Sequence, residues 1–226
     1  MFVVNVLPLL QATAHAAPVL DQSSSPLNRR AFLCCSFEFG QTFTAGITGA
    51  LVRVDVYLGD LFGSLRVDAG PLAYDVRRVV SGAPSAASGD VLVRGTLVRS
   101  TFTTDGFYTL DLGAAQIPVR VGDQFAIVLT SADPNAVGPW TWRGGEMFST
   151  YAGGTSFFRI NQSAAWAASP VDTDMAFRTF VDPAVPVPTL PEWGTCGLAL
   201  LLLMTGVAAI RRRAAHITSA FSRRPS

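Results

Sequence analysis

The longest part of the chain alternates between hydrophobic and polar residues with a period of two. In the clearest stretch, Val52, Val54, Val56 and Leu58 fall on one face. A period of two is typical of a β-strand with one buried face. Similar stretches occur at residues 37–44, 72–80, 91–98, 107–112, 124–130, 140–143, 155–160 and 174–181. Short strands separated by Gly, Asp, Pro and Asn predict an all-β domain over residues 36–181, a β-sandwich of the jelly-roll type.

Three segments of this body carry a resemblance to a known group of domains. They are QTFTAG at residues 41–46, SGAP at 81–84 leading to VLVRGT at 91–96, and VGDQFAIVL at 121–129. In this order they resemble the bacterial choice-of-anchor surface domains, which are discoidin-like jelly rolls found with several different C-terminal anchors. The resemblance implies the fold and gives no activity, because one fold hosts many functions.

The N-terminus has the pattern of a secretory signal. Residues 2–10 are almost wholly apolar, and Ala14, His15 and Ala16 precede Ala17. Small residues separated by one position are typical of a signal-peptidase site. We therefore expect a signal peptide over residues 1–16, cleaved between Ala16 and Ala17, and an N-terminal linker over 17–35. No Arg or Lys precedes the apolar run, so a buried N-terminal strand remains the alternative.

The C-terminus has the pattern of a membrane helix. Residues 195–210 carry no charge, and the apolar segment counted from Trp193 is 18 residues long. A helix of that length spans about 27 Å, enough for a thin bilayer. Arg211, Arg212 and Arg213 follow as a basic membrane stop. We expect a transmembrane helix over residues 193–210 and a basic cytoplasmic tail over 211–226, with a buried core helix as the alternative.

A proline-rich linker over residues 182–191 leads into this helix and carries a motif. The motif residues are Val187, Pro188, Thr189, Leu190, Glu192, Trp193 and Gly194. Together with the apolar helix and the arginine cluster they resemble the IPTL-CTERM sorting signals of Gram-negative bacteria, which belong with the PEP-CTERM family of exosortase substrates. The resemblance implies export, retention in the inner membrane, processing near residues 188–190 by an exosortase-type enzyme, and delivery to the cell surface or extracellular matrix. An uncleaved single-pass anchor is the alternative.

Composition and charge narrow the function further. Hydrophobic residues make up 49% of the 226-residue chain and charged residues 15%, which excludes a disordered protein. Between residues 17 and 187 there are 12 Arg against 15 Asp and Glu, while residues 211–226 carry five Arg and no acid. A mildly acidic body without a basic field predicts no nucleic-acid partner.

The exported body lacks the residues of most catalytic sites. His15 lies in the predicted signal and His216 in the predicted tail, and the chain has no Lys. A Ser-His-Asp triad, a Schiff-base lysine and a three-His zinc site are therefore excluded from the body. Paired carboxylates remain for glycosidase chemistry. The candidates are Asp172 with Asp174, which are also weak Ca²⁺ candidates, and Glu38 with Glu146.

Aromatic residues in the last third of the body suggest a binding surface. The candidate glycan-binding residues are Trp140, Trp142, Tyr151 and Trp166. Two residues apart on a strand, Trp140 and Trp142 would face the same side. The alternative is that these rings fill the core. For the adjacent Cys34 and Cys35, a strained vicinal disulfide, a bridge to another chain and two thiols all remain open.

These observations predict a non-enzymatic protein without a cofactor or metal. We expect it in the cell envelope of a Gram-negative bacterium, with a structural or adhesive role. Its expected partners are an exosortase-type processing enzyme, the inner membrane, and exopolysaccharide or surface glycans as candidate ligands. The rival hypothesis is a carbohydrate-active enzyme that uses acidic residues.

Overall fold

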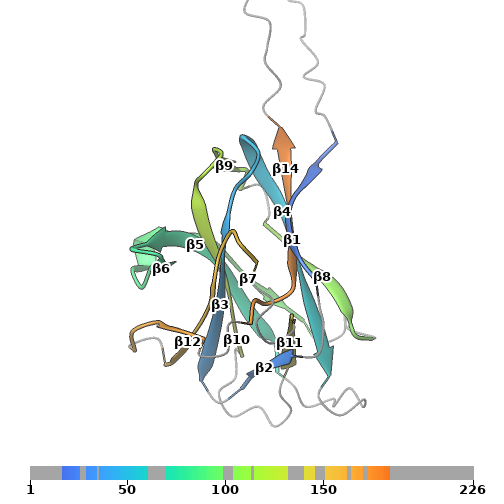
Figure 1. Cartoon of the computed structure of the whole chain (residues 1–226). Coiled ribbons are helices and arrows are strands. Elements are labelled where there is room, and N and C mark those ends of the chain that lie inside the picture. Colours follow the sequence, from blue (N-terminus) through green and yellow to red (C-terminus); the bar gives the residue numbers. More distant parts are fainter. Residues whose placement is uncertain are drawn as a thin grey trace, which may run out of the picture. The chain divides into compact units, whose positions relative to one another are not determined.

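The computed structural model describes residues 17–25, 29–34, 36–60, 70–98, 104–112, 115–131, 140–145, 151–161, 164–169 and 173–183. All of them belong to one compact unit, Met1–Ala184. Within the described residues there are fourteen strands and one short 3-10 helix, η1 (Ser88–Asp90). The strands form two antiparallel sheets that pack face to face (Figure 1). The predicted all-β class is confirmed, as a sandwich that approaches a barrel.

The first sheet is built around its longest strand, β4 (Gly49–Asp60). The order is β1-β14-β4-β11-β2, and β8 and β9 pair with the opposite side of β4. The partners are β1 (Val19–Ser24), β14 (Phe177–Pro183), β11 (Trp140–Gly144), β2 (Arg29–Leu33), β8 (Gly106–Leu110) and β9 (Ile117–Val119). Because β4 is long, it pairs with β14 over residues 49–56 and with β11 over 58–60.

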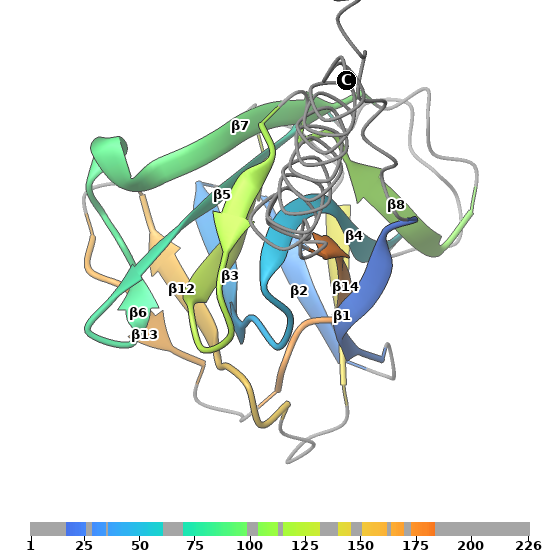
Figure 2. The same cartoon turned by 90° about the horizontal axis from the view of Figure 1, so that it is seen from above.

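The second sheet has the order β13-β12-β3-β10-β5-β6, and β7 pairs with β5. Its strands are β13 (Ala167–Ala168), β12 (Ser156–Ile160), β3 (Phe37–Thr44), β10 (Gln124–Ser131), β5 (Leu72–Val80), β6 (Ala83–Pro84) and β7 (Val91–Leu97). Viewed from above, β3, β5 and β12 lie in one layer and β4, β14 and β1 in the other (Figure 2). One sheet therefore covers the inner face of the other.

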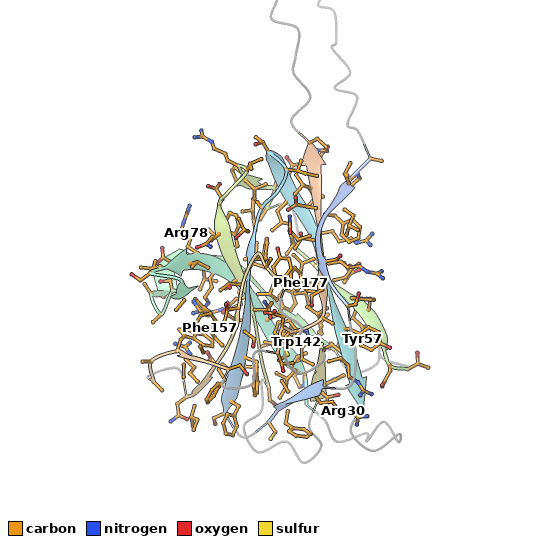
Figure 3. The ribbon with its side chains drawn as sticks, in the orientation of Figure 1. Arg30, Tyr57, Arg78, Trp142, Phe157 and Phe177 are labelled. Carbon is orange, nitrogen blue, oxygen red and sulfur yellow. The ribbon has the colours of Figure 1, made fainter. Side chains whose placement is uncertain are left out.

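The core fills the space between the two sheets. Phe43 on β3 and Phe177 on β14 meet across it, with ring centroids 5.9 Å apart. Figure 3 shows Trp142 and Phe177 between the layers, whereas Tyr57 lies on the outer side of the first sheet. Alternation along each strand thus separates a buried face from an outer face.

The predicted alternation along β4 is confirmed for Val54, Val56 and Leu58, all fully buried. It is wrong for Val52, which is only half-buried, while Leu51 takes the buried position. The cause is a β-bulge. Phe180 pairs with Arg53 and Val181 with Leu51, so Val52 is the extra residue. A bulge shifts the side-chain alternation by one position, which a strict period of two cannot anticipate.

The predicted linker over residues 17–35 is wrong, because this segment forms β1 and β2. They pair with β14 and β11, on the side of β4 opposite to β8 and β9. Val19 and Leu20 remain 45% and 49% exposed. As an edge strand that buries little apolar surface, β1 is held by backbone pairing and lacks a clear hydrophobic alternation, whereas β2 buries Ala31 and Leu33. The sandwich accordingly runs from Val19 to Pro183.

Several predictions fall outside the described residues. They concern the signal peptide over 1–16, the sorting motif at 187–194, the helix over 193–210 and the arginines at 211–213. Of the predicted linker over 182–191, Asp182 and Pro183 end β14 and the rest is also outside. Among the described residues, no helix is long and apolar enough to cross a membrane.

The turn between β5 and β6 contains a glycine whose backbone conformation can be tested by substitution. Its two loop residues, Ser81 and Gly82, both have positive φ, 53° and 81°, as in a type I′ turn. We expect Gly82→Ala to lower the free energy of unfolding by about 1 kcal/mol, because a Cβ is disfavoured in this backbone region. Gly89→Ala is the matched control, since both sites have open space but Gly89 is not in that region. Equal losses in urea denaturation of the two variants would contradict the assigned turn.

Candidate binding site

A cavity of about 560 Å³ lies on the outer face of the second sheet. The register of the paired strands explains which residues form the floor of the cavity. Glu38, Thr130 and Ala73 form one row across β3, β10 and β5, and Val128 and Asp75 belong to a neighbouring row. All five line the cavity. Alternating residues of the same strands pack into the core, so this floor is the outer face.

Two segments form the rim of the cavity. On one side, Ala86 and Ser88 come from the connection between β6 and β7, and Val91 begins β7. On the other side, Ser36 and Asn161 stand next to each other, with the Asn161 amide donating to the Ser36 carbonyl at 3.0 Å. The volume falls within the range of small-ligand sites in proteins.

The first charged pair of the floor lies within β5. Arg77 donates from Nε to Asp75 Oδ1 at 2.6 Å and from Nη2 to Asp75 Oδ2, and its Nη1 donates to the Ser85 carbonyl at 2.7 Å. The two side chains are 5% and 9% exposed. Residues two apart on one strand share a face, which brings this pair together. Every guanidinium nitrogen of Arg77 is therefore engaged.

The second charged pair joins β12 and β3, where Arg159 is the register partner of Glu38. Arg159 Nε and Nη2 lie 2.6 and 2.5 Å from the same oxygen, Glu38 Oε2. The Trp166 ring lies over the guanidinium, with its centroid 4.3 Å from Cζ. Arg159 Nη1 is buried and has no hydrogen-bond partner among the described residues. A buried donor without an acceptor costs about 1–3 kcal/mol of folding free energy. An acceptor that reached Nη1 would therefore be favourable.

A third arginine, Arg94 on β7, lines the cavity with a side chain that is 66% exposed. Its Nη2 lies 3.8 Å from Asp75 Oδ2, an oxygen that already accepts from Arg77. Arg94 is thus only loosely held. The cavity lining contains three arginines and two carboxylates, a formal excess of one positive charge.

Two of the predicted glycan-binding residues are in the core. Trp140 and Trp142 are 3% and 0% exposed, and their indole nitrogens donate to the Gly70 and Ala176 carbonyls at 2.9 and 3.0 Å. Their predicted role in stacking on a sugar is therefore wrong, and the core alternative holds. The reason is the position of β11, which lies inside the first sheet between β4 and β2.

The other two aromatic candidates have different places. The Tyr151 hydroxyl donates to Gln22 Oε1 at 2.6 Å, and its ring meets Phe177 edge-on at 5.2 Å. Burial of Tyr151 raises its pKa to about 12. Trp166 is partly buried over Arg159. Its partner Arg159 lines the cavity, so Trp166 is adjacent to the candidate site.

Each pair of carboxylate candidates has one member, Asp174 or Glu38, among the described residues. Asp174 is 3% exposed, and its Oδ1 accepts from Gln41 Nε2 at 2.8 Å. Gln41 Oε1 in turn accepts from the Met175 amide at 2.7 Å. Asp172 and Glu146 lie outside the described residues. Within the described part of the chain, no group of three or more metal-ligating side chains gathers. Asp174 therefore links β3 to the segment before β14.

This assignment predicts a structural effect of Asp174→Asn. We expect the free energy of unfolding to fall by about 1–3 kcal/mol, because the new amide places a donor against Gln41 Nε2 or the Tyr151 amide. Thermal unfolding with 2 mM Ca²⁺ (a concentration of about this order suffices for extracellular sites) and with chelator should show the same loss. A loss seen only with Ca²⁺ would assign Asp174 to a metal site instead.

The cysteine alternatives stay open. Cys34 is partly buried just after β2, where its carbonyl accepts from the Phe37 amide at 2.9 Å, and Cys35 lies outside the described residues.

Sequence reasoning missed four of the five charged residues of the cavity and named only Glu38, as a catalytic candidate. A signal was present for Asp75 and Arg77, which have opposite charges two positions apart in one strand. Such a pair shares one face of a strand. The pairing of Arg159 with Glu38 depends on strand register and has no local signal.

The fold and the cavity define this chain as a β-sandwich protein with a charged cavity on one sheet face. No family model and no curated protein matches the chain. The geometry and chemistry of the cavity are therefore the basis on which a function is proposed.

Proposed function

We propose that this chain is an exported cell-envelope protein whose jelly-roll sandwich binds a carbohydrate in the cavity on the outer face of the second sheet. The observation that carries the proposal is a small-ligand-sized cavity with a floor of fixed hydrogen-bonding groups. Sugar hydroxyls both donate and accept hydrogen bonds. The carboxylates of Glu38 and Asp75 accept, and Arg94 and Arg159 donate.

Preorganisation supports binding. The ion pairs hold Asp75 and Glu38 in place before a ligand arrives, so little side-chain freedom is lost when it binds. Ala73 and Val128 supply apolar floor between the charged groups, which suits the carbon face of a sugar ring. Arg159, which also lines the cavity, keeps one buried donor, Nη1, without a partner among the described residues.

Binding without catalysis is the form of this proposal that fits the residues best. A glycosidase of the usual type needs one carboxyl group to protonate the leaving oxygen and a second to act as nucleophile or base. Glu38 and Asp75, the acids in the described lining, are each engaged by an arginine. The enzyme hypothesis gains no separate support.

The proposed route to the envelope is compatible with the sheet boundaries. Cleavage after Ala16 would leave β1 complete, because β1 begins at Val19. Processing at residues 188–190 would leave β14 complete, because it ends at Pro183. Both predicted cleavage sites thus lie outside the strands of the sandwich, as cleavage of a signal peptide and of an IPTL-type sorting signal requires.

Binding is tested by titrating the purified full chain with a panel of oligosaccharides in a calorimeter. Ser88→Trp places a bulky ring at the cavity rim, and we expect it to weaken binding by at least about tenfold through steric exclusion, equivalent to about 1.4 kcal/mol. Ala87→Trp is the matched control, since Ala87 is the exposed neighbour and does not line the cavity. Equal binding by both variants would move the site elsewhere.

Sorting is tested by mass spectrometry of the cell-associated protein after trypsin treatment. The informative peptide begins at Thr179, after Arg178. A peptide that ends within residues 187–192 supports processing and sorting. A peptide that runs intact to Arg211 would establish a permanent anchor and overturn the exosortase route.

A further inference from the structure

We propose that the cavity selects an acidic sugar, meaning an oligosaccharide with a carboxylate or sulfate group on its ring. This inference rests on the proposed function and names the ligand class of the same site. Its basis is the unequal use of the three arginines in the cavity lining.

The three arginines differ in how many of their guanidinium nitrogens already have a partner. Arg77 uses all its guanidinium nitrogens on Asp75 and Ser85. Arg159 directs Nε and Nη2 to one oxygen of Glu38, and Nη1 remains without a partner in the described structure. Arg94 approaches only an oxygen that Arg77 already occupies. Two arginines therefore keep capacity for an anionic ligand.

The local charge favours an anion as well. The cavity lining has one more arginine than carboxylates, although residues 17–187 as a whole have 12 Arg and 15 acids. The positive excess is thus a property of this site and not of the whole body. A guanidinium group has a planar fork of donors that fits the oxygens of a carboxylate or sulfate.

The positions of the two arginines set the ligand's length. Arg159 is on β12 and Arg94 on β7, with β3, β10 and β5 between them. Four strand spacings separate their backbones by roughly 19 Å, and both side chains reach the cavity between. Glu38, Thr130 and Asp75 lie along this path and can bind hydroxyl groups. An oligosaccharide of a few units, with acidic groups near its ends, fits this arrangement better than a single sugar.

The test uses the full chain and three probes: a galacturonate tetramer, its carboxyl-reduced galactose counterpart, and a sulfated galactose tetramer. We expect an acidic tetramer to bind at least about tenfold more tightly than the reduced one, the effect of one charge-assisted hydrogen bond. Sodium chloride should weaken this preference by screening. Preference for the galacturonate assigns a carboxylate, and preference for the sulfated probe assigns a sulfate; either supports an acidic sugar.

Arg94→Ala is the diagnostic variant, because its exposed side chain is not needed for the fold. It should reduce binding of the preferred acidic tetramer by about tenfold and binding of the reduced tetramer by clearly less, because a hydrogen bond to a charged group is stronger than one to a hydroxyl. Arg78→Ala is the matched control, since Arg78 is exposed on neighbouring β5 and does not line the cavity (Figure 3).

The failure of this inference differs from the failure of the proposed function. Equal binding of acidic and reduced tetramers, with Ser88→Trp weakening both, would overturn acidic selectivity and leave carbohydrate binding in place. An absence of binding for the three tetramers and the oligosaccharide panel would overturn carbohydrate binding and the inference with it.

Discussion

Replacing Glu38 with alanine is expected to lower the free energy of unfolding by about 3–5 kcal/mol. The substitution removes the carboxylate that pairs with Arg159, whose side chain is only 3% exposed. Arg159 would then carry a largely buried charge without its carboxylate partner, and its Nη1 has no hydrogen-bond partner among the described residues. The loss is measured by urea denaturation followed through tryptophan fluorescence.

Two controls separate this effect from general damage to the sheet. A double variant, Glu38→Leu with Arg159→Met, should recover most of the stability, because replacing both members of a buried pair removes the unpaired charge. Arg94→Ala should cost less than about 1 kcal/mol, since the Arg94 side chain is largely exposed and its ion pair with Asp75 is long, at 3.8 Å. A cost below about 1 kcal/mol for Glu38→Ala would contradict a buried pair.

Much of the sandwich could be predicted because its inner faces follow the period of two. Val54, Val56 and Leu58 are buried where the alternation places them. The alternation of apolar and polar residues fails where burial of apolar side chains does not determine the structure. The bulge at Val52 shifts the alternation, and β1 lies at a sheet edge where Val19 and Leu20 stay exposed. Backbone pairing stabilises such segments, and it leaves little trace in the sequence.

The candidate site was harder to predict because it combines residues from five strands. Glu38 and Arg159 are far apart in the chain and meet only through the register of β3 with β12. From the sequence, aromatic residues were chosen as the glycan-binding candidates, and four of the five charged residues of the cavity were not named. Tryptophan has the same composition signal whether it fills a core or binds a sugar, so its role depends on which sheet position it occupies.

Trp142 provides the sharpest test of that distinction, and Trp142→Ala is expected to cost about 3–5 kcal/mol of folding free energy. Its ring is fully buried between the sheets, and its indole donates to the Ala176 carbonyl at 3.0 Å (Figure 3). Alanine would leave a large void and remove that hydrogen bond. The measurement is urea denaturation of the full chain.

Trp142→Phe and Trp166→Ala complete this experiment. Phenylalanine keeps most of the ring volume and should therefore lose clearly less stability than alanine at position 142. Trp166→Ala should affect stability less than Trp142→Ala, because Trp166 is only partly buried, and should weaken sugar binding by uncovering Arg159. If Trp142→Ala instead kept its stability and abolished sugar binding, Trp142 would be a surface residue of the binding site. Its burial in this sandwich would then be incorrect.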